Sequence, residues 1–101
     1  MTGPDFELIY LTQQEVIDAA PSMAEAIELA EGVLAEHAAG QVENPPKPGI
    51  HPLDDAFIHA MPAFLRRRRQ AGLKWIGGFF SNPARSLPSL SGLIVLNDAE
   101  T

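Results

Sequence analysis

The chain contains no cysteine, so disulfide bonds and cysteine-ligated metal sites are excluded. A reducing cytoplasm is the simplest setting for such a sequence, and we expect a cytoplasmic protein. The chain also lacks any apolar run near the ~20 residues that span a bilayer. The segment from Met1 to Asp5 has neither the basic start nor the apolar core of a signal peptide.

Basic side chains are scarce. Seven lysines and arginines face thirteen aspartates and glutamates, which gives 7 − 13 = −6. A general nucleic-acid binder needs positive surface for phosphate, so this balance argues against one. Apolar residues make up 46% of the 101 residues, a composition that suits one globular domain with a modest core.

The first 40 residues predict a short strand and two helices. Phe6 to Leu11 is an apolar run of strand formers. Thr12 to Glu15 and Ser22 to Glu25 both fit capping boxes, which mark helix starts. We expect the first helix to end near Ala20, before a proline, and the second, amphipathic helix to end at Gly40.

The remainder predicts a proline-rich loop followed by strands. Residues 41–55 hold four prolines and favour an extended loop or an edge strand, which often carries binding groups. Apolar runs predict strands over 56–65, 73–80 and 92–96, with a turn at 66–72 and a connection over 81–91. We therefore expect an α+β domain over 1–101, with helices packed on one face of a mixed or antiparallel sheet.

Lys74 is the first candidate for chemistry, because it lies inside an apolar strand. A buried lysine must meet an anion or lose its proton, so Lys74 could bind a substrate carboxylate. Alternatively, it extends to solvent from an edge strand. Lys47, held between prolines, is either a second carboxylate contact or an ordinary exposed lysine. Gly77 and Gly78 indicate a bulge or bend, or a ligand against bare backbone.

Histidines and arginines give weaker signals. His51 and His59 do not have a metal-ligand spacing, and His59 in an apolar strand favours a core histidine, so we expect no metal site. His37 suits the end of a helix. The run Arg66 to Arg69 either contacts phosphate or forms a solvated turn paired with the acidic helix. No glycine-rich dinucleotide fingerprint and no P-loop is present in the chain.

Taken in order, several segments resemble the ornithine cyclodeaminase/mu-crystallin family. The resemblance covers nearly the whole chain, and its ordered set of segments is specific where no single one is. The similar segments are Tyr10 to Val16, Ser22 to Ile27, Met61 to Phe64, Ala71 to Trp75, Asn82 with Pro83, Leu87 to Ser89 and Leu93 to Asp98.

The resemblance implies a substrate site. Lys74 matches the family's strand lysine, which contacts the substrate carboxylate beside the reacting carbon. Lys47 falls near a family arginine, and this change removes bidentate pairing. Ser89 falls at a pocket threonine, and Met61 is implied to line the pocket.

The resemblance also implies a Rossmann domain after this region, absent from these 101 residues, which would bind NAD or NADP. The implied reaction is hydride exchange at the α-carbon of an amino or imino acid, with deamination and cyclisation or imine reduction. A homodimer joined through this domain is expected, with no nucleic-acid or membrane partner. The alternatives are a non-catalytic binding or structural protein like mu-crystallin, and a small nucleic-acid module acting through Arg66 to Arg69.

Overall fold

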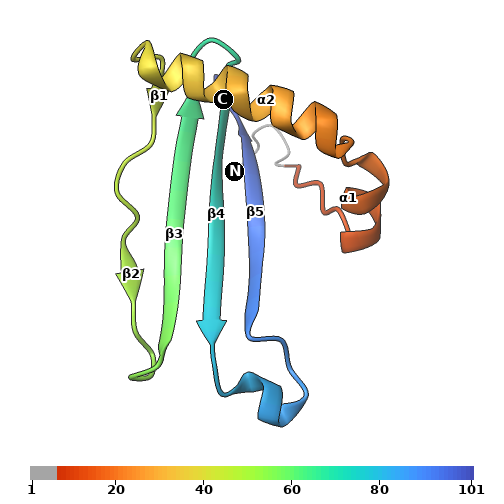
Figure 1. Cartoon of the computed structure of the whole chain (residues 1–101), viewed down its shortest axis with the longest axis vertical. Coiled ribbons are helices and arrows are strands. Elements are labelled where there is room, and N and C mark those ends of the chain that lie inside the picture. Colours follow the sequence, from red (N-terminus) through yellow and green to blue (C-terminus); the bar gives the residue numbers. More distant parts are fainter. Residues whose placement is uncertain (1–6) are drawn as a thin grey trace, which may run out of the picture. The chain divides into compact units, whose positions relative to one another are not determined.

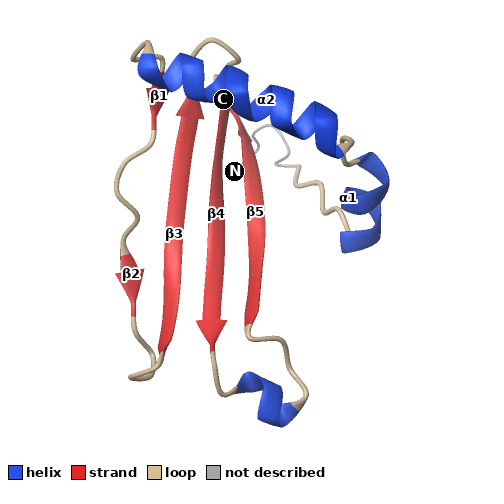
Figure 2. Cartoon of the chain, in the orientation of Figure 1, coloured by secondary structure: helices blue, strands red, loops and turns tan. Residues whose placement is uncertain are grey.

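A computed structural model describes residues 7–101, which fall into two compact units divided between Ala30 and Glu31 (Figure 1). Two helices come first and a sheet follows. Figure 2 shows the helices in blue and the strands in red. The elements are α1 (Gln13–Ala19), α2 (Met23–Ala38), β1 (Val42–Glu43), β2 (Gly49–Ile50), β3 (Ala56–Leu65), β4 (Gln70–Phe79), η1 (Asn82–Arg85) and β5 (Leu90–Asp98). The expected α+β class is confirmed. No helix within residues 7–101 is both long and apolar enough to cross a membrane.

The segment before α1 differs from the expectation. Residues 7–11 form neither helix nor strand, so the predicted opening strand is wrong there, and Phe6 lies outside the described residues. A strand needs a neighbour to take its backbone hydrogen bonds, and no described strand pairs with this segment. Its side chains are correspondingly open to solvent, with Leu8 79% and Ile9 75% exposed.

Both capping boxes are present. In α1, the Thr12 hydroxyl accepts a hydrogen bond from the Glu15 amide, and the Glu15 carboxylate accepts one from the Thr12 amide. Ser22 and Glu25 repeat this exchange at the start of α2. α1 ends at Ala19, two residues before Pro21, as predicted.

The capping exchange at α2 shifts the titration of Glu25. The backbone amide of Ser22, and then its hydroxyl, hold the pKa of the Glu25 carboxyl below its usual value because they bond the ionised form. The resulting stabilisation is present above the pKa of the unfolded chain. It is lost as the pH falls through the lowered pKa of the folded chain.

α2 ends in a Schellman motif. The Gly40 amide donates to the His37 carbonyl at 3.0 Å, and the Gln41 amide donates to the Glu36 carbonyl at 2.9 Å. Gly40 adopts a φ of 74°, a left-handed conformation that costs glycine little. The predicted stop at Gly40 is confirmed.

The five strands form one antiparallel sheet in the order β1-β3-β4-β5, and β2 also pairs with β3. β3 has the predicted bounds. β4 begins three residues earlier than predicted, because Arg66 to Arg69 complete the turn alone and Arg69 takes a positive φ of 53°. β5 also extends beyond its apolar run, since backbone pairing with β4 continues to Asp98.

Pro62 is accommodated within β3 by a gap in the sheet. The Ala60 amide donates to the Pro48 carbonyl and the Arg66 amide donates to the Gln41 carbonyl. The backbone N–H groups of the even-numbered residues of β3 therefore point toward β1 and β2. Pro62 belongs to this set, and it falls between the short pairings with β2 and β1. Its missing N–H is therefore not needed by any described strand.

Gly77 and Gly78 form no bulge. β4 keeps unbroken register with both neighbours through this pair. The Phe57 ring covers Gly78 so closely that a Cβ there would lie 2.4 Å from it. The predicted bend is wrong, and the Phe57 ring occupies the space that a ligand on Gly78 would need.

A clasp, defined as Gly32, Glu36 and Arg68, joins the last two turns of α2 to the β3–β4 turn, and Figure 1 shows this part of α2 crossing that end of the sheet. The Arg68 Nε donates to Glu36 Oε2 at 2.8 Å, and the Glu36 residue is only 8% exposed. A Cβ on Gly32 would lie 2.7 Å from Arg68 Nη2, so the guanidinium lies against bare helix backbone. The expected pairing of the arginine turn with the acidic helix is confirmed for Arg68.

Arg68→Ala should destabilise the fold by about 1–3 kcal/mol, because it leaves the buried Glu36 carboxylate without its cation. Urea-induced unfolding followed by circular dichroism measures this effect. Arg67→Ala, a neighbour in the same turn, is the matched control and should unfold within about 0.5 kcal/mol of the wild type. Equal midpoints for the two variants would show that the clasp contributes nothing.

Gly40→Val should cost about 1–2 kcal/mol, since a β-branched side chain is strained at positive φ. Nothing lies within 4 Å of a Cβ at this position, so conformation alone sets the cost. Gly40→Asn should lose less, because asparagine tolerates the left-handed region. The same unfolding assay compares the two, and an equal loss in both variants would contradict the assignment.

Candidate functional site

The register of the sheet sorts its side chains onto two faces, because residues alternate along a strand and directly paired residues share a face. We call one the lysine face. Its residues are Phe57, His59, Met61, Ala63 and Leu65 of β3, Gln70, Gly72, Lys74, Ile76 and Gly78 of β4, and Leu90, Gly92, Ile94, Leu96 and Asp98 of β5. Asp98, in the row next to the β3–β4 turn, is the one acidic residue among them, and it lies two rows from Lys74.

Lys74 lies in the middle of the lysine face. It pairs with Met61 on β3 and Ile94 on β5, so β4 is an interior strand and the edge-strand interpretation of this lysine is wrong. Lys74 is nonetheless exposed, and Met61 is 36% exposed. No ion pair joins Lys74 to any residue within 7–101, which leaves its ammonium available to an anion.

Lys47 lies in the segment between β1 and β2, two residues before β2 begins. Pro48 accepts a hydrogen bond from Ala60, so continuing the β2–β3 register by one residue sets Lys47 beside Met61. Two strand spacings then separate it from Lys74, about 10 Å. The chain has only these two lysines. Lys47 itself belongs to no strand, so the pairings of the sheet do not place its side chain on either face.

Ser89 lies elsewhere. Its carbonyl accepts a hydrogen bond from the Phe79 amide at 2.8 Å, just before β5 begins. Phe79 is five residues from Lys74 along β4, about 16 Å of strand. The serine is therefore at the opposite end of the sheet from the β3–β4 turn, and its implied pocket role stays a prediction.

An open hollow of about 280 Å³ adjoins Lys74. Besides the lysine, its lining includes Ile76, Leu90, Gly92 and Ile94 of the lysine face. These residues run from the Lys74 row away from the β3–β4 turn. The hollow therefore lies over β4 and β5, and no residue of β3 lines it.

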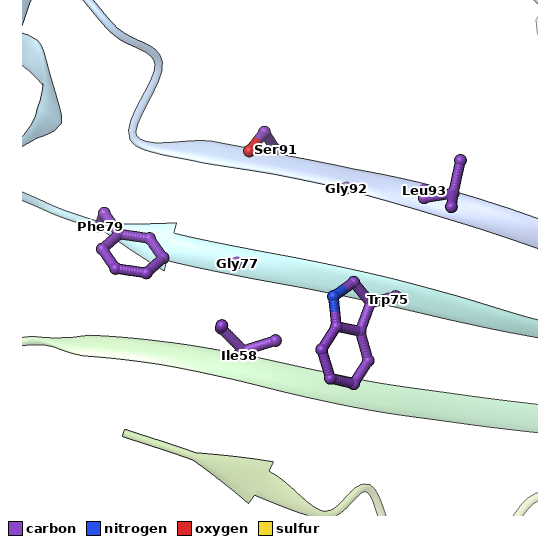
Figure 3. Close-up of a pocket in the computed structure, with 7 residues that line it drawn as sticks. All are labelled: Ile58, Trp75, Gly77, Phe79, Ser91, Gly92 and Leu93. Carbon is purple, nitrogen blue, oxygen red and sulfur yellow. The ribbon is translucent and has the colours of Figure 1, made fainter. Parts of the chain in front are cut away.

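The opposite face carries a second open hollow of about 330 Å³ (Figure 3). Trp75, Phe79, Ile58 and Leu93 surround the bare backbone of Gly77 there. No charged side chain lines this hollow, so it offers nothing to neutralise a carboxylate. The sheet therefore separates the hollow beside Lys74 from the hollow around Gly77.

His59 is a residue that the sequence did not single out as a ligand contact. It lies on the lysine face, directly opposite Ile76 and beside Gly49 of β2. Its ring stacks on Phe57 with centroids 4.3 Å apart. A core histidine would be enclosed, whereas this one is half-buried.

Most arginines of the β3–β4 turn contact other residues of the chain. Arg69 pairs with Glu100, and Arg66 lies over the Phe64 ring at 5.5 Å. With Arg68 in the clasp, three of the four arginines in the turn have partners within the chain, which favours the solvated-turn interpretation. No cluster of three potential metal ligands occurs among residues 7–101.

Two curated relatives match most of the chain. The nodulation efficiency protein NfeD of Rhizobium meliloti is 48% identical over 92 residues, which is 91% of this chain and 29% of that protein. The alanine dehydrogenase of Archaeoglobus fulgidus is 37% identical over 95 residues, 94% of this chain and 28% of that protein. The chain therefore spans less than a third of the length of these relatives.

Two solved structures share the fold. An archaeal alanine dehydrogenase dimer with bound NAD superposes with a TM-score of 0.78 at 35% identity, covering 87% of this chain and 27% of that chain. The Δ1-pyrroline-2-carboxylate reductase of Thermococcus litoralis, solved with NADH and L-proline, gives 0.80 at 28% identity over 87% and 28%. A model of the ornithine cyclodeaminase/mu-crystallin family matches residues 8–101. The chain belongs to the ornithine cyclodeaminase/mu-crystallin family.

Proposed function

We propose that the full-length protein is an NAD(P)-dependent enzyme that transfers a hydride at the α-carbon of an amino or imino acid, and that this chain binds the substrate. The observation that carries the proposal is an ammonium without a partner, Lys74, on an interior strand beside a hollow. Relatives named as an alanine dehydrogenase and a pyrroline-carboxylate reductase support the reaction class.

Lys74 acts in this proposal by binding the substrate carboxylate. A carboxylate held by an ammonium at a fixed strand position restricts where the α-carbon can lie, and such positioning accelerates a transfer between two bound reactants. Lys47 supplies a second point charge from across β3. Met61, between them, contributes apolar lining, and Ser89 remains a proposed hydroxyl contact at the end of the sheet.

The cofactor, NAD or NADP, supplies the hydride acceptor or donor when it is bound. Residues 7–101 do not fit its pyrophosphate, because no glycine-rich turn leads from a strand into a helix among them. We therefore assign the cofactor to a nucleotide-binding domain elsewhere in the full-length protein. What this chain contributes is the orientation of the substrate.

We also propose a homodimer formed through this domain. Within residues 7–101, β5 hydrogen-bonds only to β4, so its outer edge is open to a further strand. Leu93, Ile94 and Leu96 on this strand are all more than half exposed. The similarity to an alanine dehydrogenase dimer supports this assembly.

Lys74→Ala in the full-length protein should lower kcat/KM by about 100-fold, since the carboxylate loses its charge-assisted partner. Reduction of NAD or NADP with L-alanine and L-proline as trial substrates provides the assay. Arg67→Ala is the matched control, because it removes an exposed cation outside the lysine face. The circular dichroism spectra of both variants should equal that of the wild type.

Unchanged kinetics in a folded Lys74→Ala protein would contradict the assigned role. Absence of turnover together with absence of NADH and NADPH binding, measured by fluorescence titration, would overturn the enzyme proposal itself. That result would favour a non-catalytic binding protein.

A further inference from the structure

We propose that the substrate is an amino or imino acid whose side chain is aliphatic, uncharged and larger than a methyl group. Ile76, Leu90 and Ile94 bind this side chain. The inference rests on the proposed function, because it names the class of substrate that the same site takes. The observation behind it is the lining of the hollow of about 280 Å³ beside Lys74.

The hollow lies where β5 has a gap in its row of side chains. On the lysine face, Leu90, Gly92 and Ile94 follow one another along β5, and Gly92 carries no side chain. Leu90 and Ile94 are four residues apart, about 13 Å along the strand. On the neighbouring strand, Ile76 pairs directly with Gly92. The hollow is therefore bordered by an aliphatic side chain at each end along β5 and by another on β4.

The gap at Gly92 is imposed by the close approach of the β4 backbone. A Cβ at Gly92 would lie 2.7 Å from the Trp75 carbonyl oxygen and 3.2 Å from the Ile76 Cα. A side chain could not enter there unless one of the strands moved. The space between Leu90 and Ile94 is thus a fixed feature of the pairing between β4 and β5.

The charges of the lining fit a single acid group. Lys74 is the one charged residue that lines the hollow, and no acidic residue lines it. Ser91 and Leu93 also border it, but their side chains lie on the opposite face of the sheet (Figure 3), so they present backbone here. With its first carboxylate on Lys74, a substrate that carried a second charge would place that charge against aliphatic side chains, which is costly without a partner.

The size of the hollow favours a side chain larger than that of alanine. One water occupies about 30 Å³ in the liquid, so a methyl group would leave most of the space to solvent. Ile94 is 67% exposed and Leu90 is 53% exposed. A longer aliphatic side chain covers this apolar surface, and each methylene that it buries favours binding about fourfold.

The first test compares kcat/KM for L-leucine and L-alanine in the full-length protein with NAD and NADP. The wild type should prefer leucine at least tenfold, and Ile94→Ala should lower the leucine-to-alanine ratio at least fivefold. A wild-type preference for alanine, L-ornithine or L-glutamate would overturn the inference. An unchanged ratio in a folded Ile94→Ala protein would overturn it as well.

Leu96→Ala is the matched control. Leu96 is an exposed aliphatic residue on the same face of β5, but it does not line the hollow. Both residues lie on the strand proposed to join two copies, so an effect on assembly would alter both variants alike. The ratio should stay unchanged in Leu96→Ala, and an equal fall in the two variants would overturn the assignment of Ile94.

Calorimetric titration with small acids separates this inference from the proposed reaction. Pentanoate should bind the full-length protein at least tenfold more tightly than glutarate and 5-aminopentanoate, which carry a charge at the far end, and than the shorter propionate. Tighter binding of pentanoate without any turnover would count against the reaction and support the aliphatic site. Turnover of alanine with equal binding of the four acids would support the reaction and overturn the aliphatic site. Binding of none of them would also overturn it.

Discussion

The unbroken pairing of β3 with β4 is the constraint on which the proposed site depends. It runs from Ala56 opposite Phe79 to Leu65 opposite Gln70, so the position of every side chain on these strands follows from one register. A slip of one residue would move Lys74 to the face that now carries Trp75, and Trp75 to the lysine face. The proposed recognition of a carboxylate by this sheet therefore depends on backbone hydrogen bonding as much as on the lysine itself.

Contacts at both ends of the hairpin favour that register. At the turn, Arg68 is held by Glu36 and lies against Gly32 of α2. At the other end, the Phe57 ring fits only over a residue without a side chain, which Gly78 provides. Pro62 is tolerated because it falls in the gap between the pairings of β3 with β2 and with β1. The same features that stabilise the sheet thus determine which face carries Lys74.

Local signals in the sequence predicted the elements that depend on local physics. The capping boxes at Thr12 and Ser22, the stop at Gly40 and the bounds of β3 need only neighbouring residues. The expected strand over residues 7–11 failed, because a strand depends on a partner that apolar pattern does not reveal. The start of β4 was misplaced because pairing, rather than hydrophobicity, fixes where a strand begins.

For the candidate site, too, the sequence predicted only the part of the arrangement that depends on local pattern. Alternation predicted that Lys74 and Ile76 share a face, but only the register shows that Met61 and His59 join them and that Ser89 lies about five residues away. The most direct test of the lysine face is a crystal structure of the full-length protein with NADH and a bound substrate acid. The account predicts the substrate carboxylate within hydrogen-bond distance of Lys74 Nζ, on the face that carries Met61. A substrate acid bound over Trp75, or away from this sheet, would contradict it.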